Sequence, residues 1–286
     1  MQLNDVIKRN LRLGWQIMTN EIDFKTEDYF IAYFDILGYK NMLNEKNVDI
    51  NKNLLTAIDE CIKTSHTVFY MASEISKNLY GNNQKDYEVD IKIKSFSDNF
   101  FFCTKKNPIL LMIYVCVLQA VFVTKNIFIR GALNYGMLYY SESFVFGNGL
   151  IKAYELESQI SIFPRLLIDD TYYLAMKNRI ANDDFFTDDL RKETNKVLND
   201  SINIDFDNNK YLNYLGLISY FDTKENENNE LTLDFVLREH MNNIMNSLSL
   251  ENRSIKQKYH WCRDYHNKFC SKNGHTDYII STIQES

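Results

Sequence analysis

Proline and glycine are scarce in this chain of 286 residues, which contains 2 and 9 of them. This scarcity excludes collagen-like, fibrous and proline-rich linker architectures. An excess of basic charge is also missing, because the formal net charge is −6. Proteins that coat nucleic acid usually present a basic face, so we expect no stable complex with nucleic acid.

The chain also has no Cys-x-x-Cys pair, and its 5 cysteines are an odd number. Reduced thiols in a cytoplasmic protein are therefore the expected state. The most hydrophobic run, residues 109–123, is interrupted by Gln119 and is shorter than the roughly 20 residues of a membrane-spanning helix. We expect a buried core helix there, no secretory signal in the N-terminal segment, and no membrane partner.

Hydrophobic residues make up 45% of the chain and aromatic residues 14%, which is enough for a sizeable core. We expect three parts. Residues 1–28 form an N-terminal helix and an entry loop. Residues 29–175 form the catalytic domain, and residues 176–286 form a mainly helical C-terminal extension packed on that core.

The order of elements in the middle part predicts the fold class. An apolar strand at residues 29–34 is followed by helical spacing at 54–79 and a polar insert at 80–88. A hairpin of residues 89–94 and 100–103 follows, and then a helix that begins near Pro108 and a strand at 127–135. This order indicates an α+β fold with a βαββαβ ferredoxin-like core, in which helices cover an antiparallel sheet.

Beyond residue 175 the pattern changes. Residues 211–217 are strand-like, residues 223–230 are typical of a solvated linker, and residues 231–269 have helical apolar spacing. The region contains little glycine and no phosphate-binding motif. It is therefore expected to be an appendage rather than an independent enzyme.

Two aspartates stand where strands end. Asp35 follows the aromatic strand, and Asp98 lies in the hairpin between two apolar strands. Neighbouring strands of one sheet would bring the two carboxylates within several ångströms of each other. Such a pair suits a two-metal phosphoryl-transfer site that holds Mg²⁺ or Mn²⁺. The alternative is that each aspartate simply ends its strand in solvent.

Four short segments resemble class III nucleotidyl cyclases and occur in the order of that family. They are residues 34–39 (FDILGY), 94–98 (KSFSD), 130–136 (RGALNYG) and 146–157 (FGNGLIKAYELE). The resemblance covers about residues 29–168. It implies a palm-type cyclase core and a homodimer whose active sites form across the interface.

The resemblance also implies roles for individual residues. Asp35 and Asp98 would bind two Mg²⁺ or Mn²⁺ ions, with the Ile36 carbonyl oxygen as a further ligand. Arg130 would contact the triphosphate, and Lys94 would contact the base. Backbone amides would cradle the phosphates at three residues: Leu37, Gly38 and Tyr39.

The chain departs from the family pattern in the last segment. Ile151 and Glu155 stand where the family has an Asn and an Arg that contact the nucleotide, and Lys152 is one candidate substitute for that Arg. Phe144, near the position that helps to choose adenine, offers no hydrogen bond to a base. These departures favour an unusual base, such as the uracil or cytosine of the antiphage Pycsar-type cyclases, or a degenerate site.

The sequence therefore predicts a cytoplasmic, homodimeric enzyme that converts a nucleoside triphosphate to a 3′,5′-cyclic nucleotide and pyrophosphate, with a role in antiphage defence. One alternative is a nucleotide-binding sensor module that has the fold without turnover. Another is a palm-type cyclic oligonucleotide synthase. Such synthases usually carry paired acids at the hairpin, whereas Asp98 is followed here by Asn99.

Overall fold

The computed structural model describes residues 25–43, 52–63, 67, 90–183, 186–222, 231–249 and 253–281. Residues 52–63 are helical, as expected. The rest of the helix expected at 54–79 lies outside the described residues, apart from residue 67. The N-terminal helix, the insert at 80–88 and the linker at 223–230 also lie outside them.

A four-stranded antiparallel sheet forms the centre of the molecule. Strand β1 (Glu27–Ile36) pairs with β3 (Asn99–Thr104) on one side and with β4 (Ile129–Tyr140) on the other, and β2 (Lys92–Phe96) pairs with β3. The strand order β2-β3-β1-β4 is that of a βαββαβ ferredoxin-like core. The predicted α+β class is confirmed.

The sheet continues beyond this core and becomes mixed. Strand β6 (Leu166–Ile168) pairs with β4 in parallel, and β8 (Lys210–Leu212) and β7 (Ile202–Ile204) follow at the edge. The short β5 (Val145–Phe146) pairs with β4. Residues beyond 175 thus add two strands to the main sheet, in addition to helices.

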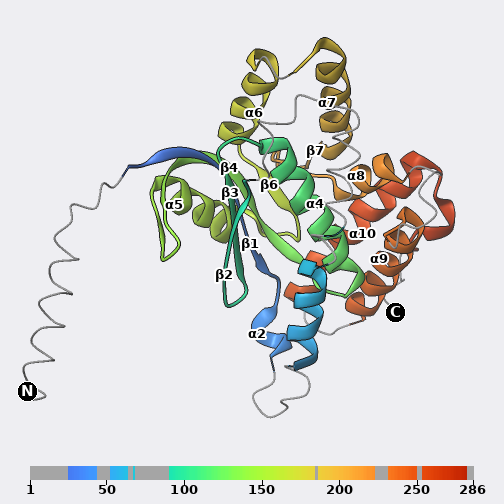
Figure 1. Ribbon diagram of the computed structural model, residues 1–286. Coiled ribbons are helices and arrows are strands. Elements are labelled where there is room, and N and C mark those ends of the chain that lie inside the picture. Colours follow the sequence, from blue (N-terminus) through green and yellow to red (C-terminus); the bar gives the residue numbers. More distant parts are fainter. Residues whose placement is uncertain are drawn as a thin grey trace, which may run out of the picture.

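The aromatic strand β1 is buried because both faces of the sheet are covered. Side chains alternate along a strand. Phe30 and Phe34 belong to a cluster with α4 (Pro108–Thr124), and Ile31 packs in a second cluster with Ala153 of α5 (Asn148–Glu155). Figure 1 shows α5 on one side of the sheet and α4 on the other. Asp35 is in phase with Ile31, so it faces the α5 side.

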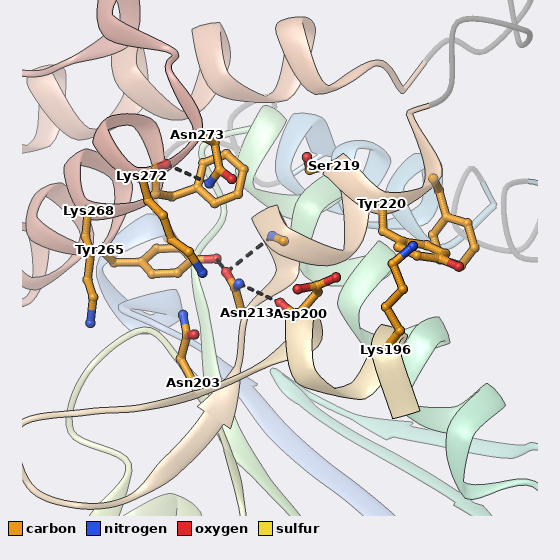
Figure 2. Close-up of a pocket in the computed structure, with 13 residues that line it drawn as sticks. Lys196, Asp200, Asn203, Asn213, Ser219, Tyr220, Tyr265, Lys268, Lys272 and Asn273 are labelled. Atoms are coloured by element: carbon orange, nitrogen blue, oxygen red, sulfur yellow. Dashed lines mark hydrogen bonds between the residues drawn. The ribbon is translucent and has the colours of Figure 1, made fainter. Parts of the chain in front are cut away.

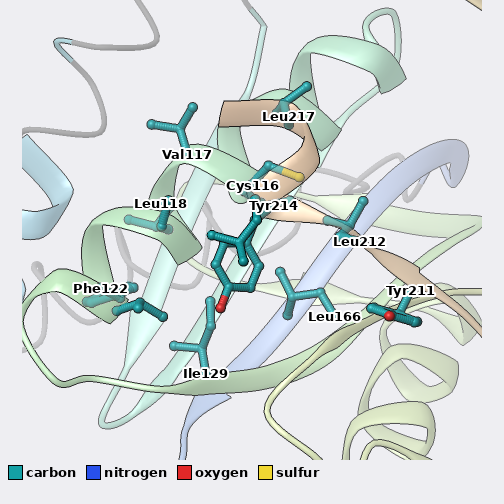
Figure 3. Close-up of a cluster of buried hydrophobic side chains, with 14 of the residues drawn as sticks. Cys116, Val117, Leu118, Phe122, Ile129, Leu166, Tyr211, Leu212, Tyr214 and Leu217 are labelled. Carbon is teal, nitrogen blue, oxygen red and sulfur yellow. The ribbon is translucent and has the colours of Figure 1, made fainter. Parts of the chain in front are cut away.

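Helix α4 fills the interior between the sheet and the C-terminal helices. Nearly all of its residues are buried, and it contacts α8 (Tyr214–Phe221) and α9 (Leu233–Leu248). Figure 3 shows its side chains among those of β4, β6, β8 and α8. The expectation of a buried core helix is confirmed. Among the described residues, no helix has the length and hydropathy needed to cross a bilayer.

The remaining elements are mainly helical, as predicted. They are α2 (Tyr39–Met42), the π-helix η2 (Leu156–Ile160), α6 (Asp170–Asn182), α7 (Asp188–Ser201), α10 (Arg253–Asn273) and the 3₁₀ turn η3 (Thr276–Tyr278). The expected boundary after residue 175 falls inside α6. The larger cluster of buried side chains runs without interruption from β1 to α10.

Candidate active site

Asp35 and Asp98 lie at the same end of the central sheet. Asp35 is the penultimate residue of β1, and Asp98 lies in the tight turn between β2 and β3, next to Ser97 with its left-handed φ of 57°. The Ile36 amide donates a hydrogen bond to the Asp98 carbonyl oxygen at 3.1 Å. The turn of the hairpin is therefore fixed beside the end of β1, and the two aspartates lie close together.

Arg130 holds the Asp35 carboxylate in a two-pronged ion pair. The two residues face each other in the register of β1 and β4. Arg130 Nε lies 3.0 Å from Asp35 Oδ1, and its Nη2 lies 3.1 Å from Oδ2. Bidentate arginine–carboxylate pairs are strong and geometrically specific. The side chains are 24% and 16% exposed, so the pair is accessible from solvent.

A third carboxylate, that of Glu157, joins this cluster from η2. Its Oε1 lies 2.8 Å from Arg130 Nη2, as an ion pair without hydrogen-bond geometry. Burial and the neighbouring carboxylates of Asp35 and Asp98 raise the pKa of Glu157 to about 7, although Arg130 opposes the shift. Three acidic groups thus surround one arginine, and one of them can carry a proton near neutral pH.

Glu157 was absent from the predicted site residues, although the sequence contains a signal for it. It lies four residues after Ala153 and eight after Gly149, both of which are buried on the inner face of α5. That spacing places Glu157 on the same inward face. The π-helical turn that carries Glu157 has no comparable signal in the sequence, and such turns are frequent at functional sites.

Helix α10 brings a lysine to the same end of the sheet. The Tyr259 ring packs edge-on against Phe128 with centroids 5.1 Å apart, and the Phe128 carbonyl accepts the Leu37 amide at 2.8 Å. The adjacent Lys258 is partly buried. Burial and the charge of Arg130 lower its pKa, whereas Asp35 acts in the opposite direction. Lys258 is therefore a second cation near the carboxylates, and no local pattern in the sequence indicated it.

Tyr33 and Asn99 orient Asp98. The Tyr33 hydroxyl donates to Asn99 Oδ1 at 2.7 Å, and Asn99 Nδ2 donates to Asp98 Oδ1 at 3.2 Å. Burial and the nearby carboxylates, with Glu157 first among them, raise the pKa of Tyr33 to about 12. The tyrosine is thus neutral at physiological pH and serves as a hydrogen-bond donor.

The structure gives other partners to three of the predicted substrate-binding residues. Lys94 donates to the Glu142 carbonyl oxygen and lies over the Tyr140 ring. Phe144 is half-exposed in the same β4–β5 connection. Lys152 forms an ion pair of 2.6 Å with Asp169, the residue that caps the N-terminus of α6.

The predicted phosphate-cradling segment is a tight turn after β1. The Leu37 amide is occupied by the Phe128 carbonyl oxygen. Gly38 adopts a left-handed conformation with φ 76° and precedes the four-residue helix α2, which begins at Tyr39. The amides of Gly38 and Tyr39 therefore lie at the start of that helix. The Leu37 amide instead connects the end of β1 to the residue that precedes β4.

The donor set suits a divalent cation that is shared with a phosphate ligand. Within the described part of the chain, no group of three or more His, Cys, Asp or Glu side chains is placed to hold a metal ion. However, Mg²⁺ is usually bound by one or two carboxylates, waters and substrate phosphates rather than by a complete protein cage. The crowding of carboxylates that raises the pKa of Glu157 is what a bound cation would relieve. The carboxylates of Asp35 and Asp98 therefore suit such an ion, whereas the Ile36 carbonyl oxygen stays a predicted ligand.

Comparisons with known proteins give distant likenesses. No family model and no curated protein match the chain. Among solved structures, it is similar to the catalytic core of a rhodopsin-guanylyl cyclase with converted specificity, in complex with ATPαS, at 13% identity over 54% of this chain and 84% of that one, with a TM-score of 0.35. It is also similar to the monomeric guanylyl cyclase domain of the RhoGC fusion protein from the aquatic fungus Blastocladiella emersonii, at 14% identity over 54% and 88%, with a TM-score of 0.32.

Proposed function

We propose that this protein is a metal-dependent nucleotidyl cyclase, which converts a nucleoside triphosphate to a 3′,5′-cyclic nucleotide and pyrophosphate. One observation carries the proposal: Asp35 and Asp98 lie together at the end of the sheet, with Arg130 beside them. Phosphoryl transfer requires mainly positioning and charge neutralisation, which carboxylate-held cations and an arginine provide.

Each group has a distinct part in this proposal. Asp35, Asp98 and the Ile36 carbonyl oxygen would hold Mg²⁺ or Mn²⁺, which would neutralise charge on the triphosphate and lower the pKa of the 3′-hydroxyl. Arg130 binds phosphate oxygens with its planar fork. Glu157, with a pKa of about 7, accepts the proton of the attacking hydroxyl.

Lys258 supplies positive charge that α5 lacks. Glu155 stands on α5 where the resemblance would require an arginine, and its side chain is exposed. Lys258 approaches the Asp35–Arg130 pair from α10. We therefore assign to Lys258 the neutralisation of charge on the transferred phosphoryl group or on the leaving pyrophosphate.

The proposal also includes the base of the substrate and the biological role of the product. With Ile151 and Glu155 in place of the purine-type Asn and Arg, we propose UTP or CTP as the substrate and an antiphage signal as the product. Lys94 and Phe144 remain the predicted contacts for the base. Lys94 belongs to β2, and its ammonium group reaches the β4–β5 connection, in which Phe144 lies. We propose that a second subunit brings such contacts to the carboxylates.

A homodimer is part of the proposal. Several exposed apolar side chains occur on α5, β4, β5 and the β4–β5 connection: Met137, Phe144, Phe146, Ile151 and Tyr154. Exposed apolar surface is typical of interaction sites. Light scattering on the purified protein measures the mass, and a monomeric mass at the concentration of full activity would contradict the dimer.

The test is incubation of the purified protein with ATP, GTP, CTP and UTP and Mn²⁺, with the products read by mass spectrometry. We expect one cyclic mononucleotide, reduced about 1,000-fold or more in Asp35→Asn and in Asp98→Asn. Asp189→Asn, at an exposed position of α7, is the matched control and should keep full activity.

The other outcomes identify the alternatives. Saturable binding of a nucleotide without any product would favour the sensor module. A product with the mass of a cyclic oligonucleotide would favour the palm-type synthase. Full activity in both aspartate variants would remove the basis of the proposed site.

A further inference from the structure

A pocket lies in the C-terminal part of the chain, with a volume of about 630 Å³. Its lining comes from α7, β7, α8 and α10, whereas the carboxylate cluster is built from β1, β4, η2 and the β2–β3 turn (Figure 2). Small-molecule sites typically have volumes of roughly 300–1,000 Å³. The size of this pocket is therefore that of a ligand site.

The charge in this pocket is opposite to that of the protein as a whole. Three lysines line it, Lys196, Lys268 and Lys272, and Asp200 is the single carboxylate among the described lining residues. The whole chain has a formal net charge of −6. A local excess of ammonium groups in an acidic protein attracts an anion.

The lysines approach the pocket from two sides. Lys268 and Lys272 are one turn apart on α10 and therefore project from the same face of that helix. Figure 2 shows the end of Lys272 directed over the pocket towards Asn213, with Lys196 on the other side beside Tyr220. The Lys196 ammonium lies 5.4 Å from the Tyr220 ring centroid.

The floor of the pocket is fixed by hydrogen bonds. Asn213 Oδ1 accepts from the Tyr265 hydroxyl at 2.8 Å and from the Gly216 amide at 3.2 Å, and Asn213 Nδ2 donates to the Asp200 carbonyl oxygen at 2.7 Å. The buried Tyr265 hydroxyl also accepts the Leu215 amide at 3.0 Å. A preformed floor reduces the conformational entropy that the protein loses when a ligand binds.

We propose that this pocket binds a small phosphorylated ligand. Lysine binds phosphate as a compact positive charge. The lining contains three lysines and one aspartate, and this excess of positive charge favours a dianionic phosphate. The Asn203 amide and the Ser219 hydroxyl supply hydrogen bonds for the rest of the ligand. This site is separate from the nucleotide site proposed above and goes beyond it.

The test is titration calorimetry at low ionic strength with inorganic phosphate, pyrophosphate and AMP as probes. We expect at least one probe to bind, with a Kd that rises at least about tenfold in the double variant Lys268→Ala/Lys272→Ala. The matched control is Lys192→Ala, at an exposed lysine of α7 outside the pocket, and it should leave the Kd unchanged. Because the replaced lysines are exposed, the melting temperature should also be unchanged.

A second variant distinguishes binding in this pocket from binding at the carboxylate cluster. Arg130→Gln/Lys258→Ala removes the two cations of that cluster to which an anion would bind, and it should bind the probe as tightly as the unaltered protein. Failure of all three probes to bind, or a Kd unaffected by the double lysine substitution, would overturn this proposal. Neither result would affect the proposed cyclase, which the product assay tests without any probe.

Discussion

The charges of Asp35, Arg130 and Glu157 depend on one another. Arg130 forms close ion pairs with both acids, but it donates three hydrogen bonds to Asp35 and none to Glu157 Oε1. Glu157 therefore carries most of the cost of burial, and its pKa rises to about 7. One residue of the cluster, Glu157, is thus poised to exchange a proton near neutral pH.

The variant Glu157→Gln tests the raised pKa of Glu157 through the pH dependence of protein stability. The pKa of Glu157 rises from 4.5 to about 7 on folding, so the folded state binds its proton more tightly, and its contribution to stability falls as the pH rises through that range. We expect the variant to be more stable than the unaltered protein at pH 8 by about 1–3 kcal/mol and equally stable at pH 4. Urea unfolding at the two pH values measures the difference. Glu155→Gln, at an exposed neighbour, should show no such change.

Lys258→Ala tests the contribution of α10 to the proposed chemistry. Loss of a cation beside Arg130 should lower kcat about 10- to 100-fold and leave the fold intact, because the side chain is only partly buried. Lys256→Ala, two residues earlier on α10, is the matched control. Equal activity of the two variants, measured by product formation, would remove Lys258 from the site.

At the scale of the elements, β1 and β4 approach each other so closely that one position on β4 requires glycine. A Cβ at Gly131 would lie 2.1 Å from the Tyr33 carbonyl oxygen and 2.4 Å from Phe34 Cβ. These are backbone-anchored atoms of the neighbouring strand and cannot rotate away. Gly131 therefore allows the pairing that places Arg130 opposite Asp35.

We expect Gly131→Ala to destabilise the protein by about 2–4 kcal/mol, because it forces the two central strands apart. Gly274→Ala is the control: its Cβ would meet nothing within 4 Å, and only the left-handed φ of 78° opposes it. That variant should lose about 1–2 kcal/mol. Thermal unfolding compares the two, and a smaller loss in Gly131→Ala would contradict the close approach.

Helices α9 and α10 are joined by a buried pair of histidines. His266 Nε2 faces the Tyr278 carbonyl oxygen at 2.8 Å, so this nitrogen must donate, and His266 Nδ1 must accept. His240 Nδ1, 3.2 Å away, is then the donor, and its Nε2 accepts from the Tyr214 hydroxyl at 3.1 Å. This chain of bonds is complete with both rings neutral, the form that burial favours.

Acid should therefore weaken this junction. Burial lowers the pKa of both histidines, that of His240 well below 6.5, so the unfolded chain binds protons that the folded one does not. Stability is fully present above about pH 6.5 and falls below it. Urea unfolding should show this loss in the unaltered protein and a smaller one in His240→Gln. His260→Gln, at a partly exposed position, should retain the full loss.

The sequence predicted the elements whose signals are local. The aromatic run of β1 ends in Asp35, the hairpin alternates around Asp98, and Pro108 begins α4 as its first residue. Each of these depends on short-range periodicity or on one backbone preference. The proximity of Asp35 and Asp98 followed from the strand order, whereas Arg130 came from the resemblance to the cyclase family.

The elements that the sequence did not reveal depend on long-range contacts. Strand β7 has three residues and gains its identity from pairing with β8 at the sheet edge. The run at residues 211–217, expected to be strand-like, is strand only at its start, in β8, and its last four residues belong to helix α8. Lys258 reaches the site only because α10 packs on Phe128. Neither feature is encoded in a local pattern, and β-propensity is weak where packing decides.

At the scale of the whole molecule, the two halves of the chain share one core. Helix α4 is apolar all round, with one side on the sheet and the other on α8 and α9. Arg165 is buried at the sheet edge and forms ion pairs with Asp205 and Asp207 of the β7–β8 connection. The residues beyond 175 are therefore structural partners of the sheet.

We expect a chain truncated after residue 183 to aggregate, because the loss of α8 and α9 would expose apolar surface of several hundred Å² on α4. The full chain should unfold in a single cooperative transition. Size-exclusion chromatography and thermal unfolding of both chains measure these outcomes. A soluble, monomeric truncated chain with a sharp transition would show that residues 25–183 fold on their own.

The ion pair between Arg130 and Asp35 has a thermodynamic consequence for ligands. A cation that binds Asp35 competes with Arg130, and an anion that binds Arg130 competes with Asp35. Each ligand removes the competitor of the other, so the two should bind with positive heterotropic coupling of about 1–3 kcal/mol. In the ligand-free protein, Arg130 and Asp35 thus serve as counter-ions for each other. By linkage, each ligand raises the affinity for the other by the same factor.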